Sequence, residues 1–142
     1  MQFTRNTNTH ATLILKRGEP VIESITNVAR AESIENALIS GLGAVTDIRC
    51  GYYDLRSKEY HFRDYPELYE VVSLAGNIAL KEGQPFVHLH AVFTDHENHA
   101  FGGHVQEMTV GVTLEVALTL LPTAHARQYD EETGLHLIDC AQ

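Results

Sequence analysis

The chain has 142 residues, of which 44% are hydrophobic and 20% are charged, an ordinary globular composition with enough apolar residues for a core. Ten Lys and Arg residues stand against 19 Asp and Glu residues, a formal net charge of −9, which disfavours a nucleic-acid surface because basic side chains supply most affinity for phosphate. No segment is typical of a secretory signal or long enough to span a bilayer, so we expect a cytoplasmic protein without a membrane partner.

The length fits a single domain over residues 1–142, because no linker, low-complexity tract or internal repeat interrupts the sequence. The two cysteines, Cys50 and Cys140, lie far apart and outside any CxxC pair. We therefore expect two reduced thiols rather than a disulfide framework or a cysteine-based zinc site.

In chain order, residues 9–15 favour a first strand that ends at the turn Lys16-Arg17-Gly18. A helix follows, with Pro20 in its first turn and apolar residues at helical spacing on one side. Residues 36–43 and 44–53 then predict two strands that turn at Gly41-Leu42-Gly43.

Residues 52–62 predict a hairpin with a polar tip at 56–59, on which His61 is an exposed strand residue. Residues 68–78 and 108–121 are long β-prone runs, and residues 126–138 predict a strand, a polar turn and another strand. Together with the single early helix, this pattern predicts an α+β domain built on an antiparallel-rich sheet or partly closed barrel.

Each long run carries one carboxylate among apolar neighbours, Glu70 in the first and Glu115 in the second. A buried carboxylate needs an ion pair, hydrogen bonds or a metal-site imidazole, so both are candidate catalytic groups. The alternative is that each faces water on an edge strand.

The segment from Pro85 to His104 holds five of the nine histidines. Strand alternation in residues 87–93 places His88 and His90 on one face, and a polar turn at residues 95–99 leads into a second apolar run that ends in Gly102-Gly103-His104. A hairpin of this kind sets His104 across from the pair, and the two glycines allow another backbone or a ligand to come close.

Three imidazoles without a fourth protein ligand are typical of an open catalytic zinc site, in which water or substrate takes the fourth position. The sequence therefore predicts a divalent metal on His88, His90 and His104, with zinc the first choice and Fe, Ni, Co or Mn compatible with the same ligands. The alternative is a set of half-buried or solvated histidines without metal. His96 and His99 at the hairpin tip are expected to be solvated, or else to close over the metal as a loop.

Several segments follow one another in a recognisable order: Gly43-Ala44-Val45, residues 70–78, residues 85–91, Gly102-Gly103-His104-Val105, Glu115-Val116 and residues 127–137. In this order they resemble the PPC domain, the plants-and-prokaryotes conserved family. The His-Leu-His and Gly-Gly-His pair is the most specific part of the resemblance, which covers nearly the whole chain.

The resemblance implies a compact α+β domain that assembles as a homotrimer, with a metal-capable cluster at His88, His90 and His104. Plant members join this domain to a basic AT-hook, and prokaryotic members often carry a provisional DNA-binding label. Here Arg17-Gly18-Glu19-Pro20 places an acid where the hook has arginine, so DNA binding is not expected of this chain. A remoter similarity, to acetolactate decarboxylase, is limited to fold and histidine pattern.

Two functions therefore remain open. In the first, a metal-dependent enzyme of lyase or hydrolase type acts on a small molecule, with Glu70 or Glu115 orienting an imidazole or moving a proton and Arg127 holding a substrate carboxylate. In the second, a non-catalytic trimeric module binds a protein partner or senses a ligand. The acidic charge makes a neutral or basic protein the more favourable partner.

Overall fold

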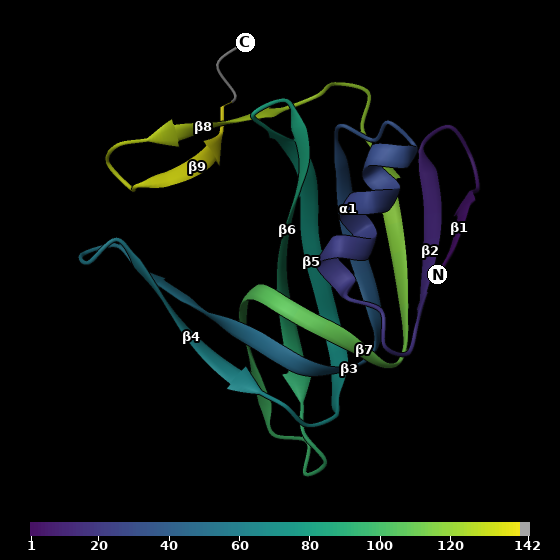
Figure 1. Cartoon of the computed structure of the whole chain (residues 1–142), viewed down its shortest axis with the longest axis vertical. Helices are drawn as coiled ribbons and strands as arrows, with labels where there is room; N and C mark the ends of the chain where they lie inside the picture. The colour runs from purple at the N-terminus through teal and green to yellow at the C-terminus, as the bar shows by residue number, and fades with distance from the viewer. Residues whose placement is uncertain (140–142) are drawn as a thin grey trace.

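The computed structural model describes residues 1–139, and this part of the chain is mostly β-structure with one helix (Figure 1). The helix, α1, spans Val21–Ala31. The strands are β1 (Gln2–Arg5), β2 (His10–Lys16), β3 (Ala37–Asp54), β4 (Glu59–Tyr65), β5 (Tyr69–Lys81), β6 (Gln84–Thr94), β7 (Ala100–Leu120), β8 (Ala126–Asp130) and β9 (Leu135–Ile138).

The described strands form one sheet in the order β1-β2-β7-β3-β5-β8-β9, with β4 paired to β3 and β6 paired to both β5 and β7. Every pairing is antiparallel except the short one between β5 and β8. The expected antiparallel-rich α+β architecture is thus confirmed in outline. Strands β3, β5, β6 and β7 pair in a ring, but they do not form a clear barrel.

The prediction of two strands meeting at a Gly41-Leu42-Gly43 turn is wrong, because β3 runs through this segment as one 18-residue strand. The glycines instead mark a bulge, where the register of β3 shifts against both β5 and β7. Gly43 has φ +150°, and a Cβ there would lie 2.8 Å from the Leu114 Cα. The glycines that suggested a turn are therefore present because the backbones of β3 and β7 approach each other closely here.

Strand β7 also departs from expectation, since it does not end at His104 but continues to Leu120 over 21 residues. Its first part pairs with β6, and the rest pairs with β3 and β2. The N-terminal strand β1, which pairs with β2, was missed because residues 2–5 show no clear apolar alternation. The remaining predicted strands are present with shifted ends.

Helix α1 lies on one face of the sheet, over β2, β6 and β7 (Figure 1). The apolar side predicted for this helix comprises Val21, Ile22, Ile25, Val28 and Ala29. All of these residues are buried except Ile22, which is only partly buried. Pro20 occupies the N-cap position with φ −71° and ψ 125°, one residue before the first helical turn. The largest fully buried side chains of the core include Phe93, Leu13, Leu15, Ile25, Ile48, Leu74, Ile78 and Leu89.

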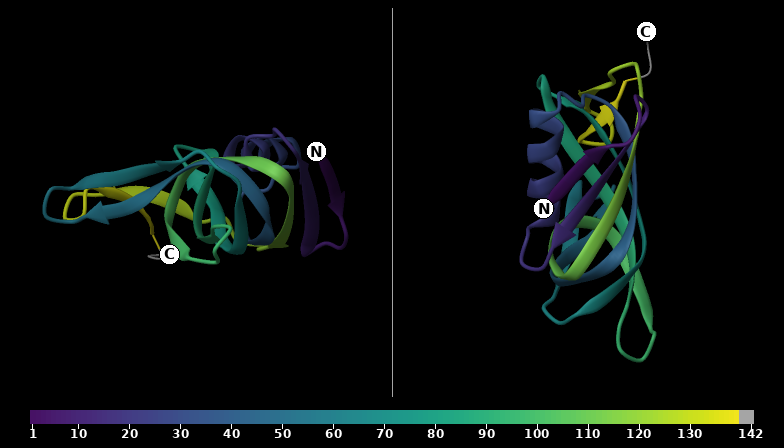
Figure 2. Two further views of the ribbon diagram at one scale, coloured as in Figure 1. Left: turned by 90° about the horizontal axis from the view of Figure 1, so that it is seen from below. Right: turned by 90° about the vertical axis from the view of Figure 1, so that its right-hand side faces the viewer.

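Two hairpins project from the same side of the sheet, β3–β4 and β8–β9 (Figures 1 and 2). Their tips are joined where the Tyr53 hydroxyl donates to the Thr133 carbonyl oxygen at 2.6 Å and Lys58 Nζ donates to the Glu131 carbonyl oxygen at 2.7 Å. No helix in the described chain is long and apolar enough to cross a membrane. Cys50 is buried with a free thiol, and Cys140 lies outside the described residues.

Candidate metal centre

Strand β6 alternates as the sequence predicts. Val87, Leu89 and Ala91 are buried on the core side, so His88 and His90 project from the opposite, outer side. His88 is half-buried and His90 is exposed. The local sequence alone thus aims both imidazoles at the same side of the sheet.

The third imidazole comes from β7, in which His104 is the direct partner of His90 across the β6–β7 pair. The neighbouring glycines allow β7 to lie tightly between two strands. A Cβ at Gly102 would clash with the Ala91 carbonyl oxygen of β6, and one at Gly103 would lie 2.5 Å from the Gly51 carbonyl oxygen of β3. The glycine pair was expected to let another backbone or a ligand come close, and the structure places the backbones of β6 and β3 there.

The three rings converge. Ring centroids are 5.0 Å apart for His88 and His90, 5.0 Å for His88 and His104, and 5.4 Å for His90 and His104. His88 Nε2 and His104 Nδ1 are 3.1 Å apart, and one nitrogen from each ring lies within 4.8 Å of the others. This group has the donor set that can hold a metal ion, and all three donors come from one chain.

Burial keeps His88 and His104 neutral. Burial, reinforced by His104, Arg127 and His90, lowers the pKa of His88 to about 4, and burial with His90 and Arg127 lowers the pKa of His104 to about 4. Neutral imidazole is the form that coordinates metal. Both rings are therefore ready to bind metal at neutral pH without first losing a proton.

Residues from distant strands cover the cluster. Tyr60 of β4 packs on His104 with ring centroids 4.7 Å apart. Gly51 of β3, which has no side chain, lies between Phe62 of β4 and His104 of β7 in the pairing. Arg127 of β8 places Nη2 3.4 Å from His88 Nδ1 and donates from the same atom to Asn77 Oδ1 at 2.7 Å. Burial lowers the pKa of Arg127. The sequence offered no local signal for either contact.

The structure separates the other two predicted catalytic residues from this cluster. Glu70 is exposed and pairs with Thr94 near the β6–β7 tip, and Glu115 is exposed between Ile14 and Leu42. No hydrogen bond or ion pair within residues 1–139 joins either carboxylate to the three histidines. Both carboxylates face water, as the alternative held, but its edge-strand placement is wrong, because β5 and β7 each pair with strands on both sides. Arg127, by contrast, is brought to the cluster.

A second metal-capable group lies at the β6–β7 tip, formed by Asp95, Glu97 and His99. Asp95 Oδ1 accepts from the backbone N–H groups of Glu97 and His99 at 2.9 Å, and Asp95 Oδ2 lies 3.3 Å from His99 Nδ1. These bonds lower the pKa of Asp95. His96 and His99 are exposed, as expected of a solvated tip, and this group is already engaged in shaping the turn.

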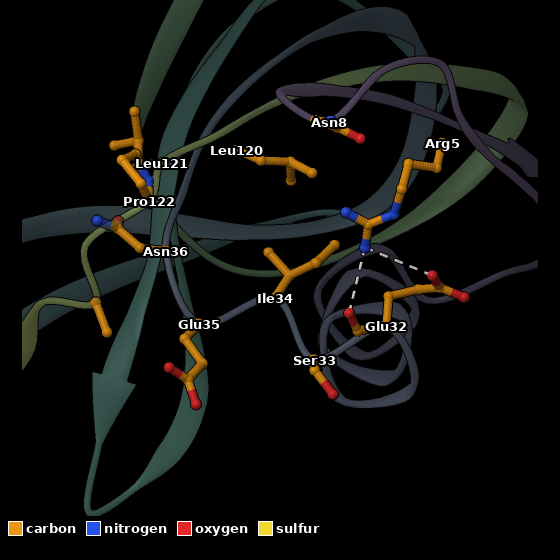
Figure 3. A pocket seen from close by; sticks show the side chains of 11 residues that line it. Arg5, Asn8, Glu32, Ser33, Ile34, Glu35, Asn36, Leu120, Leu121 and Pro122 are labelled. Atoms are coloured by element: carbon orange, nitrogen blue, oxygen red, sulfur yellow. Dashed lines mark hydrogen bonds and ion pairs between the residues drawn. The ribbon is translucent and has the colours of Figure 1, made fainter.

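Figure 3 shows a pocket of about 260 Å³ at the other end of the sheet, between β1, the segment after α1 and the end of β7. Arg5 Nη2 lies 3.6 Å from the Glu32 carboxylate and donates to the Glu32 carbonyl oxygen at 3.3 Å. The only guanidinium drawn there is therefore paired within the pocket. No group of metal-ligand type gathers at this pocket among the described residues.

Solved structures share this fold over almost the whole chain. A plant- and prokaryote-conserved protein from Pyrococcus horikoshii is 31% identical, with a TM-score of 0.87 over 99% of this chain and 95% of its own. A metal-containing protein from Archaeoglobus fulgidus is 32% identical, with a TM-score of 0.85 over 97% of this chain and 98% of its own.

A protein from Ralstonia eutropha, whose description proposes DNA binding, is 30% identical, with a TM-score of 0.88 over 95% of this chain and 94% of its own. No curated protein matches the chain. These matches leave the remoter similarity to acetolactate decarboxylase as a prediction. The Plants and Prokaryotes Conserved domain, abbreviated PCC or PPC, matches residues 2–122. Since that match spans most of the sequence, the chain belongs to the Plants and Prokaryotes Conserved domain family.

Proposed function

We propose that His88, His90 and His104 bind one divalent transition metal ion, zinc before others, and leave an open coordination position for a small molecule. The convergence of three imidazoles from two paired strands carries this proposal. A structural zinc site would be expected to supply four protein ligands, usually including cysteine. The only described cysteine, Cys50, is buried in the core, so an open, reactive site is favoured.

The spacing of one donor pair fits zinc. Two nitrogens bound to one tetrahedral zinc ion lie about 3.3 Å apart, given zinc–nitrogen bonds of about 2.0–2.1 Å. The 3.1 Å between His88 Nε2 and His104 Nδ1 is close to that value. The metal-containing relative from Archaeoglobus fulgidus, which this chain resembles over nearly its full length, also favours a metal here.

The activity that best suits such a site is metal-dependent chemistry of lyase or hydrolase type on a small molecule. A divalent ion held there supplies Lewis acidity, which polarises an oxygen of the bound molecule. Side chains near the histidines supply the other properties of the site. Tyr60 shields His104 from solvent, and Arg127 holds positive charge beside His88 without a neighbouring carboxylate within the described residues. Glu70 and Glu115 have no part in this scheme within one chain.

Metal analysis of protein purified without a His tag or added nickel tests this proposal. We expect about one ion per chain in the unmodified protein and almost none in His88→Ala, because two remaining imidazoles hold zinc far more weakly. His99→Ala is the matched control, since it removes a histidine from the tip group and should keep the full content. Equal metal content in all three proteins would reject the assignment.

The outer face of the sheet supports the second part of the proposal, self-assembly as a homotrimer. Leu42 of β3, Val72 of β5, Val92 of β6 and Val112 of β7 are 43–60% exposed, which is unusual for so many large apolar side chains on adjacent strands. Cross-strand pairing places Ser73 opposite Val92 and Ala75 opposite His90, so this face runs up to the histidines. The family resemblance favours further copies of this chain as the partner, and it implies an assembly of three copies.

The solution mass of two leucine variants tests the assembly. Leu42→Glu puts a charge on the outer face and should reduce a trimer to monomers, because an unpaired charge is costly to bury in an interface. Leu55→Glu is the control, since Leu55 is exposed to the same extent, 58% against 57%, but lies at the β3–β4 tip. Monomeric mass in the unmodified protein would reject the trimer.

A second candidate function is a non-catalytic trimeric module, and the same apolar face favours it. The relatives described as DNA-binding suggest one kind of partner. The net charge of −9 argues against it, since phosphate contacts require clustered Lys and Arg. We expect no shift of random duplex DNA at near-physiological salt, and a salt-dependent shift would favour the module over the enzyme.

A further inference from the structure

A cavity of about 250 Å³ opens beside the histidines, where residues from six strands and the β8–β9 turn meet. His88 and His104 form its inner wall, and Tyr60, Phe86 and Arg127 flank them. The joined tips of the β3–β4 and β8–β9 hairpins bound one side, with Gly134 packed against Tyr53 and Lys58. A volume of this size holds a small organic molecule rather than a chain.

The charge of this cavity is opposite to that of the chain. Lys81 and Arg127 both line it, and none of its described lining residues is Asp or Glu. Lys81 Nζ and the Arg127 guanidinium carbon lie 5.5 and 5.3 Å from the centre of the Phe86 ring. In a protein with 19 acids and 10 basic residues, an acid-free cavity with two cations favours an anionic ligand.

The guanidinium of Arg127 is only partly satisfied. Nη1 donates to the His136 carbonyl oxygen at 3.1 Å and Nη2 donates to Asn77 Oδ1 at 2.7 Å, but the buried Nε–H has no acceptor in the described chain. No carboxylate within residues 1–139 lies at ion-pair distance. Arg5 at the pocket of Figure 3 shows the contrast, since Glu32 pairs with it. Arg127 is half-buried, and a cation withdrawn from water without a counter-ion is costly unless an anion joins it.

The remaining walls are apolar. Leu135 and Leu137 of β9 and the rings of Phe86 and Tyr60 line the cavity. A hydrated inorganic ion gains little from such surfaces, whereas the hydrocarbon part of an organic acid buries against them. Two cations together with these apolar groups therefore select for a molecule with one anionic end and a short apolar body.

We infer that this cavity binds a small organic carboxylate, with its charged end on Arg127 and Lys81, its apolar part against Leu135, Leu137 and Phe86, and its far end at His88 and His104. The inference rests on the proposed metal centre, whose substrate class it names. Arg127 and Lys81 set specificity for the anion, and their planar and point charges together match a carboxylate.

Metal loading sharpens this site through His88. In the metal-free protein Arg127 Nη2 can donate to His88 Nδ1 at 3.4 Å, and His88 Nε2–H can then donate to His104 Nδ1 at 3.1 Å. Metal at His88 Nε2 leaves the remaining proton on Nδ1, so that the contact with Arg127 becomes donor against donor. One N–H of Arg127 then lacks its acceptor, and a carboxylate oxygen supplies another. Metal and carboxylate should therefore bind cooperatively.

Isothermal titration of the full chain with isobutyrate and with its neutral isostere isobutyramide tests the inference. For zinc-loaded protein we expect isobutyrate to bind at least about tenfold more tightly than isobutyramide, because only the anion forms charge-assisted hydrogen bonds. Inorganic phosphate should bind more weakly than isobutyrate, and removal of zinc should weaken isobutyrate. Equal binding of acid and amide, or tighter binding of phosphate, would overturn the carboxylate assignment.

Two variants and a control locate the site. Arg127→Gln should weaken isobutyrate about tenfold or more and Lys81→Gln by a smaller factor, both with zinc content unchanged. Arg49→Gln removes an equal charge from an exposed pair with Asp64 and should bind as the unmodified protein does. Unchanged affinity in both Lys81→Gln and a zinc-loaded Arg127→Gln would reject the cavity. Zinc content separates the two failures, because loss of isobutyrate binding with one zinc per chain leaves the metal centre standing.

Discussion

Strands β6 and β7 carry two groups of metal-ligand type, one along the strands and one at the tip that joins them, and only the first has the properties of a site. Each group brings three donor atoms within 4.8 Å of one another. At the tip, the Asp95 carboxylate already accepts two backbone N–H groups and contacts His99, and the group is open to solvent. Along the strands, His88 and His104 are half-buried and face each other.

The comparison shows that proximity of ligand-type residues is a weak criterion. What distinguishes the strand group is that burial and neighbouring positive charge disfavour protonation, while strands from elsewhere in the fold exclude water. In the tip group, the Asp95 carboxylate instead forms hydrogen bonds within its own turn, as is common for Asp in turns. Four predictions follow from this difference, in order of expected effect.

The largest predicted effect is the pH dependence of the stability of the metal-free protein. The pKa values of His88 and His104, about 4 in the folded chain against 6.5 for a free histidine, mean that the unfolded chain binds more protons between those values. The contribution of these two histidines to the free energy of unfolding is therefore complete above pH 6.5 and is lost as the pH falls towards 4. We expect a loss of about 2 kcal/mol in total, after allowing for solvent screening of half-buried rings.

Urea unfolding at a series of pH values, in the presence of a chelator, measures this loss. His88→Asn should flatten the dependence, whereas His99→Ala, which alters only the tip, should keep it. A flat profile in the unmodified protein would mean that the strand histidines are no more shielded than those of the tip.

Tyr60→Ala should have the next largest effect, because it removes the ring that covers His104. Without this ring the His104 imidazole is held less firmly in place, and zinc should bind about tenfold more weakly near neutral pH. Competition with a chromophoric chelator gives the zinc affinity. Tyr52→Ala is the control, since Tyr52 is 62% exposed and stacks on His61 instead. Equal affinities in the two variants would remove Tyr60 from the site.

Asp95→Ala should lower the midpoint of thermal unfolding by about 3 °C without changing zinc content. The carboxylate stabilises the β6–β7 turn through the backbone N–H groups of Glu97 and His99, and the variant loses both bonds. Calorimetry and metal analysis of the same sample separate the two outcomes. A drop in zinc per chain would show that the tip group takes part in metal binding after all.

The smallest effect is expected for Glu70→Gln and Glu115→Gln, in which the zinc affinity should stay within about twofold of the unmodified protein. Both carboxylates are exposed and make no contact with the histidines within residues 1–139. The same chelator competition measures them. A tenfold loss in either variant would place that carboxylate beside the histidines of a neighbouring copy in the assembly.

Local pattern was enough to predict the strand part of the centre. Alternation in residues 87–93 places two imidazoles on one face, and a polar tip with a glycine pair returns the third to them. The same reasoning failed at Gly41-Leu42-Gly43, where glycines that look like a turn lie in the middle of an 18-residue strand. A glycine marks close approach in either case, and sequence does not say which backbone approaches.

The sequence by itself determined the β-rich architecture with one helix, the exposed tip and the meeting of His88, His90 and His104, because each depends on alternation or on a short hairpin. Only the tertiary structure decided that Arg127, Lys81 and Tyr60 join them, and that Glu70 and Glu115 do not. Those relations depend on which strands pair across dozens of intervening residues. Such pairing is set by burial of the whole core, and no local spacing records it.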